Sequence, residues 1–403
     1  MSFCLDLLSH SNQEKTSQNE DLINKHDKAS NWSMAVISPD IILLIAKHAE
    51  TSTLKSLRLA SRTIASLISR TFAAKAFPYL NIQITEAGLT RLEDMCTSAM
   101  IAPYIQNIGI NTQAPRHTTI YELRRALRKS PPMDPQGVVR DIVESLLSAL
   151  YEYELLCSRG GIIDRLQSAF ENLRRNRNTE LILEIWDDGD GSCVGYKNEF
   201  DILWTMDGTT DPDGILDRGG MFCFDQFNQS RVLLALSRSG LSLKQLRVTS
   251  KAHLLAHPWD NVYNDLTLRD DMTSSYQCDD LSQIDVKEIH VVITLDCESW
   301  KQEPGFMLHR NSALHRLVAN ARSAKSFILE GQCRPAEFDA GPLLSSLALS
   351  RWSSVCLESL SIRASSLFQL RAEIGTSIKN LELRNVKWIQ DTDQNHVDCF
   401  VGS

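Results

Sequence analysis

The sequence lacks long hydrophobic runs, an excess of positive charge and any paired arrangement of cysteines. No stretch of about eighteen uncharged apolar residues occurs, so we expect no membrane span and no membrane partner. The formal net charge is −8 and no basic face is evident, which argues against a nucleic-acid partner. The ten cysteines are scattered singly, without a C-x-x-C pair, as is typical of reduced thiols in a cytoplasmic or nuclear protein.

The common enzyme motifs are missing as well. The sequence contains no G-x-S-x-G elbow, no G-x-x-x-x-G-K-[ST] phosphate loop and no G-x-G-x-x-G fingerprint. Asp188, Asp190, Ser192 and Glu199 have the spacing of Ca²⁺ ligands in a binding loop, but Cys193 stands where that loop needs glycine. An acidic surface turn is therefore the preferred interpretation.

A second possible metal site is equally weak. His253 and His257 are spaced to face one side of a helix, as zinc ligands can be. No third ligand stands nearby, and the general-base glutamate of zinc proteases is absent, so a packed or surface pair is favoured. The sequence therefore predicts no metal, no cofactor and no catalytic residue.

The composition changes several times along the chain, which is long enough for two or three domains. Polar residues dominate the start, and the Pro-rich stretch KSPPMDPQG is typical of a linker. The predicted segments are a disordered tail (1–33), three short helices (34–77), a strand-helix-strand unit (78–128), the linker (129–137) and an alternating strand and helix region (138–403) with a Gly- and Asp-rich insertion (186–222).

An apolar frame, L-x-x-L-x-L with conservative substitutions, recurs in the second part of the chain. Helical stretches such as RVLLALSRSG and SALHRLVANARS lie between the later copies. Such alternation predicts an α+β or α/β solenoid with parallel strands, an irregular leucine-rich-repeat-like array. An ordinary α/β domain with buried strands of similar spacing is the alternative. The copies are Ile105/Ile108/Ile110, Leu243/Leu246/Val248, Val286/Ile289/Val291, Ala324/Phe327/Leu329, Leu357/Leu360/Ile362 and Ile378/Leu381/Leu383.

The first predicted helix has no polar side for almost two turns, since it begins PDIILLIA with Ser38 as a possible cap. A helix that is apolar all round must be buried all round, yet about forty residues cannot surround one of their own helices. We therefore expect one side to pack inside and the other to need a partner. The expected inner residues are Ile42, Leu43 and Ala46, and the expected outer residues are Ile41, Leu44, Ile45 and His48.

These residues also carry a family resemblance. Ile37-Ser38-Pro39-Asp40, followed by IILLIAKHA and TLKSLRLASRTIASLISRTF, resembles an F-box of the fungal type over residues 37 to 112. The resemblance implies that residues 34–77 bind a Skp-type adaptor, which docks the chain on a cullin–RING ubiquitin ligase. It implies these adaptor contacts or their supports: Ile37, Pro39, Ile41, Leu44, Ile45, Leu54, Leu57 and Leu59.

The resemblance also implies a non-catalytic role in which the repeats hold a protein substrate. Within each strand the frame residues should point inward, so the alternating positions should line the other face of the sheet. Those positions are Gln245, Arg247 and Thr249, Glu288 and His290, Ser326 and Glu330, Ser359, Ser361 and Arg363, and Asn380, Glu382 and Arg384. The alternatives are an interaction scaffold without a ligase role, and an enzyme whose site is not visible in motifs.

Overall fold

The structure is a computed structural model that describes residues 37–115, 138–158, 160–176, 180–186, 222–224, 226–251, 283–294, 317–318, 321, 323–332, 344, 352–368 and 378–389. The predicted tail, the predicted linker and the interior of the 186–222 insertion lie outside these residues. The chain divides into two compact units, Met1–Phe72 and Ala73–Ser403.

Three helices follow one another from Pro39, as predicted: α1 (Pro39–His48), α2 (Thr51–Ala60) and α3 (Arg62–Ala76), the last of which begins in the first unit and ends in the second. Ser38 caps α1, because its hydroxyl oxygen accepts a hydrogen bond from Asp40 N at 3.4 Å. The four buried members of the small core come from all three helices, namely Ala46, Leu54, Ile64 and Ile68. Arg58 covers the ring of Phe72 at 4.2 Å from its centroid.

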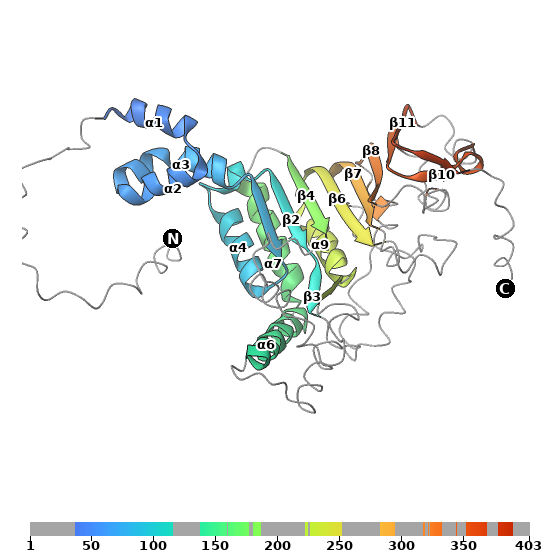
Figure 1. Cartoon of the computed structure of the whole chain (residues 1–403), viewed down its shortest axis with the longest axis horizontal. Helices are drawn as coiled ribbons and strands as arrows, with labels where there is room; N and C mark the ends of the chain where they lie inside the picture. Colours follow the sequence, from blue (N-terminus) through green and yellow to red (C-terminus); the bar gives the residue numbers. More distant parts are fainter. Residues whose placement is uncertain are drawn as a thin grey trace, which may run out of the picture. The chain divides into compact units, whose positions relative to one another are not determined.

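An eight-stranded sheet organises the second unit (Figure 1). Within this sheet each strand pairs with the strand of the same sheet that precedes it in the chain. All pairs in this sheet are parallel, as the sequence predicted. The strands are β1 (Tyr79–Gln83), β2 (Asn107–Asn111), β4 (Leu181–Trp186), β6 (Leu243–Lys251), β7 (Val286–Thr294), β8 (Ser326–Gln332), β9 (Ser354–Glu358) and β11 (Asn380–Arg384).

Two small sheets accompany the large one. One is the parallel pair β10 (Ser361–Arg363) and β12 (Lys387–Ile389). The other is the antiparallel pair β3 (Gln113–Pro115) and β5 (Phe222–Phe224). The 186–222 insertion begins where β4 ends, and there Trp186 O accepts a hydrogen bond from Thr112 N at 2.8 Å. The insertion ends at β5, which pairs with β3. Both ends of the insertion therefore lie close to the end of β2.

Helices α4 (Glu86–Thr97), α7 (Gly161–Asn176) and α9 (Gln226–Ser239) lie along the same side of this sheet (Figure 1), and α6 (Val138–Ser158) precedes α7. The short 3₁₀ helix η4 (Ala102–Tyr104) leads into β2. Arg165 joins α7 to α4, because its Nη1 lies 2.6 Å from Glu86 Oε1 and its Nη2 lies 2.7 Å from Glu93 Oε2.

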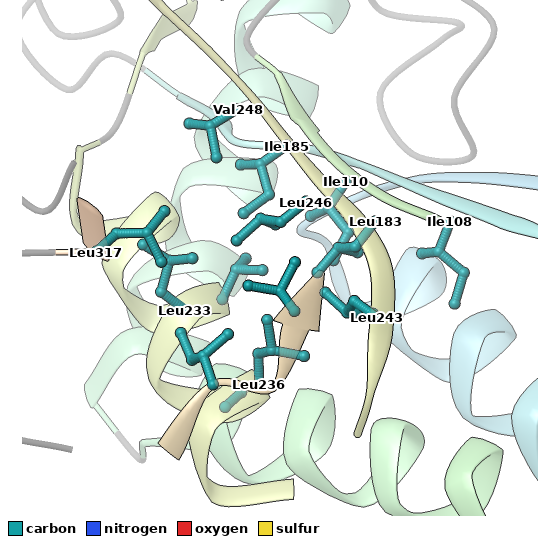
Figure 2. Close-up of a cluster of buried hydrophobic side chains, with 14 of the residues drawn as sticks. Ile108, Ile110, Leu183, Ile185, Leu233, Leu236, Leu243, Leu246, Val248 and Leu317 are labelled. Carbon is teal, nitrogen blue, oxygen red and sulfur yellow. The ribbon is translucent and has the colours of Figure 1, made fainter. Parts of the chain in front are cut away.

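The core between sheet and helices is built from one side of the strands from β1 to β9 in this sheet, and Figure 2 shows the part formed by β2, β4, β6 and α9. Ile108 of β2, Leu183 of β4 and Leu246 of β6 occupy paired positions and have no exposed surface. The same register continues through Ile289, Phe327 and Val355, which are also fully buried. The same apolar frame recurs because equivalent residues of successive strands lie side by side and are buried against one another. Helix α9 adds Leu233 and Leu236 to this core.

One predicted frame was wrong by five residues. Ser326 pairs with Ser354, so the residues that continue the frame are Trp352, just before β9, and Val355 and Leu357 of β9. The predicted frame began at Leu357 and crossed the end of this strand, where Ser359 has φ of 54°. Leu357 belongs to both frames, because apolar residues stand five and two positions before it and three and five positions after it. Spacing alone could not choose between them.

Candidate interaction surfaces

The outer side of α1 is an exposed apolar stripe. Ile37, Ile41, Leu44 and Ile45 follow the spacing of one helix face, and we call them the α1 surface. Their exposed fractions are 45%, 52%, 59% and 48%, whereas Ala46 on the inner side is fully buried. The helices of the first unit thus cover one side of α1 and leave the other uncovered, because their small core fills only the inner side.

The remaining residues implied by the F-box resemblance divide into exposed and supporting positions. Pro39 is exposed in the first turn of α1, and Leu59 is exposed on α2. Leu54 is buried in the core, and Leu57 packs against that core while partly exposed. Leu43, which we expected on the inner side, is exposed instead, so the uncovered part of α1 is wider than the sequence predicted.

A polar row crosses the side of the sheet opposite the core. Gln245 of β6, Glu288 of β7 and Ser326 of β8 are register partners. Gln245 Nε2 donates to Glu288 Oε1 at 2.5 Å, and Ser326 Oγ donates to Glu288 Oε2 at 3.1 Å. One carboxylate therefore links side chains of three strands. All three residues are partly exposed and present polar groups to whatever contacts this face.

A second group on the same face holds opposite charges together. His290 Nε2 lies 2.8 Å from Glu330 Oε2, and Arg247 Nη2 lies 3.5 Å from the same oxygen. The Nε atom of Arg247 is buried and has no hydrogen-bond partner among the described residues. Burial lowers the pKa of His290 below its ordinary value, the charge of Arg247 lowers it further, and Glu330 and Glu288 oppose this shift. His290 is therefore neutral at neutral pH.

This pKa shift predicts a pH dependence of stability. An unfolded histidine takes up a proton near pH 6.5, but folded His290 does so only at lower pH, so acid favours the unfolded chain. The contribution of neutral His290 to the free energy of unfolding is present above about pH 6.5 and is lost as the pH falls toward the lowered pKa of His290. We expect the melting temperature to fall more between about pH 7.5 and 5.5 in the wild type than in His290→Gln. An equal fall in both proteins would contradict this assignment.

The last predicted positions lie in two different sheets. Asn380, Glu382 and Arg384 belong to β11 and continue the polar face of the large sheet. Arg384 Nε donates to Glu382 Oε1 at 2.7 Å, and Arg384 Nη1 lies 3.5 Å from Glu358 Oε2. Arg363, in contrast, belongs to β10, which pairs with β12. Arg363 was expected beside the others because the frame predicted for this part of the chain lay five residues too late.

The five-residue shift of the frame also changes which residues of β9 lie on the polar face. Ser361 is buried and Ser359 lies in the turn after β9. Register places Ser354, Cys356 and Glu358 of β9 on the polar face in their stead. The polar face therefore runs through these residues from β8 to β11.

The structure adds a contact on this face that spacing did not predict. The Trp186 indole of β4 lies over Gly109 of the neighbouring strand β2. A Cβ atom at Gly109 would collide with the Trp186 ring and would lie 2.5 Å from Asn81 Oδ1. Glycine is therefore required here by close approach and not by a turn. The only sequence signal was a glycine between the two isoleucines of a strand.

A buried polar cluster was also missed. Asn228 of α9 is fully buried, and its Nδ2 donates to Thr112 O at 3.2 Å. Its Oδ1 accepts from Tyr153 OH at 3.0 Å and from Arg231 Nη1 at 2.8 Å. These bonds fasten α6 and α9 to the segment after β2. Asn228 is the first residue of a glycosylation sequon, but its burial leaves it no access to a modifying enzyme.

The described part of the chain contains no group of three side chains that could hold a metal ion. The predicted acidic surface turn with Asp188, Asp190, Ser192 and Glu199 and the pair of His253 and His257 lie outside that part. Burial, and to a smaller extent the charge of Glu93, raise the pKa of the Cys96 thiol to about 12, so this thiol is not a nucleophile at neutral pH. No helix within the described ranges is long and apolar enough to cross a membrane.

Comparison with models of known protein families finds no match for this chain, and neither does comparison with curated proteins. The function is therefore argued from the α1 surface and from the polar face of the sheet.

Proposed function

We propose that this chain is a substrate receptor of a Skp/cullin/F-box type ubiquitin ligase. The α1 surface is the observation that carries the proposal. Three large aliphatic side chains lie exposed on one face of a ten-residue helix, Ile37 lies exposed just before that helix, and the opposite face already holds the core of the unit. A soluble protein exposes such a stripe chiefly where another protein covers it. In the proposal the covering protein is a Skp-type adaptor, as the resemblance of residues 37 to 112 implies.

The residues of the first unit then take different roles. Ile37, Ile41, Leu44 and Ile45 contact the adaptor, and Leu59 of α2 adds a further exposed contact. Pro39 sets the first turn of α1, while Leu54 and Leu57 support these helices from the core. Substitution of the exposed leucine and isoleucine residues should therefore weaken adaptor binding, and substitution of the buried ones should lower the folding stability.

The second unit fits the proposed leucine-rich-repeat-like array that holds the target. The sequential order of its parallel strands supports this description, because each repeat adds one strand at the same edge. The register also repeats, so equivalent side chains of successive strands form continuous rows. One set of rows is buried and the other is the polar face, which mixes carboxylates, arginines and hydroxyls. Such a mixture suits a protein surface better than a phosphate backbone.

In this role the chain contributes no bond chemistry. The ubiquitin-conjugating enzyme and the RING subunit carry the reaction, and the receptor holds a substrate lysine close to the activated thioester. The proposal therefore requires neither a cofactor nor a catalytic side chain of this chain. Its partners are the adaptor, the cullin–RING ligase reached through it, and a protein target.

Affinity purification of the full chain tests both surfaces together. The wild type should retain the adaptor and a target that carries ubiquitin. Arg247→Gln should retain the adaptor and lose about tenfold or more of the target, because it removes a guanidinium of the kind that dominates many interfaces. The thermal melt should fall only modestly, because the ion pair of Arg247 with Glu330 is long and partly exposed. Lys244→Gln, an exposed change on the same strand, is the matched control.

The outcomes separate the proposals. A wild-type chain that never retains a Skp-type adaptor overturns the receptor role and supports an interaction scaffold. Equal target recovery with Arg247→Gln and with the wild type overturns the placement of the target on this part of the polar face.

A further inference from the structure

Within the part of the chain that the structure describes, the last strand of the large sheet has a free edge and an exposed apolar side. Among the described residues, β11 pairs with β9 alone. Leu381 and Leu383 continue the buried rows of the sheet, yet they are 44% and 38% exposed. Their register partners Val355 and Leu357 are 0% and 1% exposed. An apolar strand with one free edge is a ready template for another strand.

The direction of the backbone groups shows which residues that edge offers. Asn380 N donates to Ser353 O at 3.1 Å, and Arg384 O accepts from Ser359 N at 2.9 Å. The backbone groups of Asn380 and Arg384 therefore point toward β9. Because successive residues of a strand point to opposite sides, those of Leu381 and Leu383 point to the free edge.

We propose that β11 pairs with β11 of a second copy of this chain, antiparallel and about a two-fold axis at Leu383. In this register Leu383 exchanges two backbone hydrogen bonds with Leu383 of the second copy. Glu382 then lies opposite Arg384 of the second copy, and Arg384 lies opposite its Glu382. These are non-hydrogen-bonded positions, where side chains of opposing strands come closest.

Charge complementarity selects this register among the neighbouring ones. An axis at Glu382 would place the two Glu382 carboxylates against each other. An axis at Leu381 would place Glu382 opposite Asn380 and form no ion pair. Only the axis at Leu383 gives two opposite-charge pairs and stacks the exposed leucines on one side. The order Glu-Leu-Arg is therefore complementary to its own antiparallel copy.

Pairing of the two strands would replace the ion pair within each strand by ion pairs between the strands, so no charged side chain would lose its partner. In the single chain Arg384 bonds Glu382 of its own strand through two nitrogens, at 2.7 and 2.9 Å. Across the two-fold axis the same carboxylate and guanidinium find equivalent partners in the second copy. A two-fold pair also closes the edge, so association stops at two chains. The interface is short, and we expect a weak dimer with Kd on the order of 10–100 µM.

A charge exchange between two full-length chains tests the pairing, and it is independent of any adaptor. The wild type should change from monomer to dimer with concentration in analytical ultracentrifugation. Glu382→Arg alone and Arg384→Glu alone should each dimerise at least about tenfold more weakly, because both cross-strand pairs become like-charged. An equimolar mixture of the two single variants should dimerise again, and so should the double variant Glu382→Arg/Arg384→Glu.

Restored association in the mixture is the decisive result, since a pair formed only within one strand cannot be repaired by a second chain. A mixture that associates no better than its components overturns the proposal. A wild type that stays monomeric at millimolar concentration overturns it as well, and so does growth beyond two chains. Thermal melts accompany each variant. If a single variant melts early, Leu383→Asn keeps both charges and should still abolish the dimer.

Discussion

The double variant Ile41→Asp/Leu44→Asp is expected to bind a Skp-type adaptor about a thousandfold more weakly than the wild type. Both side chains lie at the centre of the α1 surface, where truncation of a central apolar residue costs about 2 kcal/mol or more. An aspartate there must also lose its water shell without gaining a partner. The measurement is co-purification of co-expressed chain and adaptor, followed by titration of the purified partners.

A matched variant separates this effect from added charge. Thr53→Asp/Ser66→Asp places the same two charges on exposed polar positions of α2 and α3 and should bind the adaptor normally. The folding stability of either variant should change by less than about 1 kcal/mol, because all four positions are exposed. Adaptor binding by the Ile41→Asp/Leu44→Asp variant at wild-type strength would show that α1 is not the docking element.

Gly109→Ala is expected to lower the free energy of unfolding by about 3 kcal/mol. The added methyl would collide with the Trp186 ring and approach Asn81 Oδ1. Gly109 lies within β2, between paired neighbours on both sides, so the backbone cannot easily move away. Trp186 would have to leave its position against the strand. Chemical denaturation of the full chain measures this loss.

The assigned cause is tested by a double-mutant cycle. In a Trp186→Ala background, Gly109→Ala should cost much less than it does in the wild type, because the ring is gone. Gly161→Ala is the matched control, since an added methyl there would meet Leu156 O only at an ordinary contact distance of 3.5 Å. Equal costs of Gly109→Ala in both backgrounds would exclude the indole as the obstacle.

Local chemistry made the first part of the fold predictable. Ser38, Pro39 and the apolar run after them predicted α1 and its cap. The helix expected within residues 78–128 is α4, and Thr85 caps it because its hydroxyl accepts from Gly88 N at 3.0 Å. The uncovered side of α1 was predictable because a short apolar helix has too little neighbouring chain to bury it. Leu43 was misassigned because the sequence of α1 does not determine the angle at which the other two helices pack against it.

Contacts between strands were less accessible to prediction. Trp352 and Leu360 both stand at frame distances from Leu357, and only the pairing of β8 with β9 decides between them. Arg247, His290 and Glu330 come from three separate strands, and their proximity depends on that register. Gly109 and Trp186 are likewise distant in sequence and meet only because β2 lies beside β4.

The sequence by itself determined the three N-terminal helices, the exposed side of α1 and the series of parallel strands. The helices follow from interactions within a few residues, such as caps and apolar spacing, and the parallel direction of the strands follows from the helical segments that separate them in the chain. Only the tertiary structure decided the register of β9, the polar groups that meet across the sheet and the free edge of β11. Those features depend on which distant strands pair and at which residue. Apolar periodicity leaves that choice open when two registers bury similar side chains.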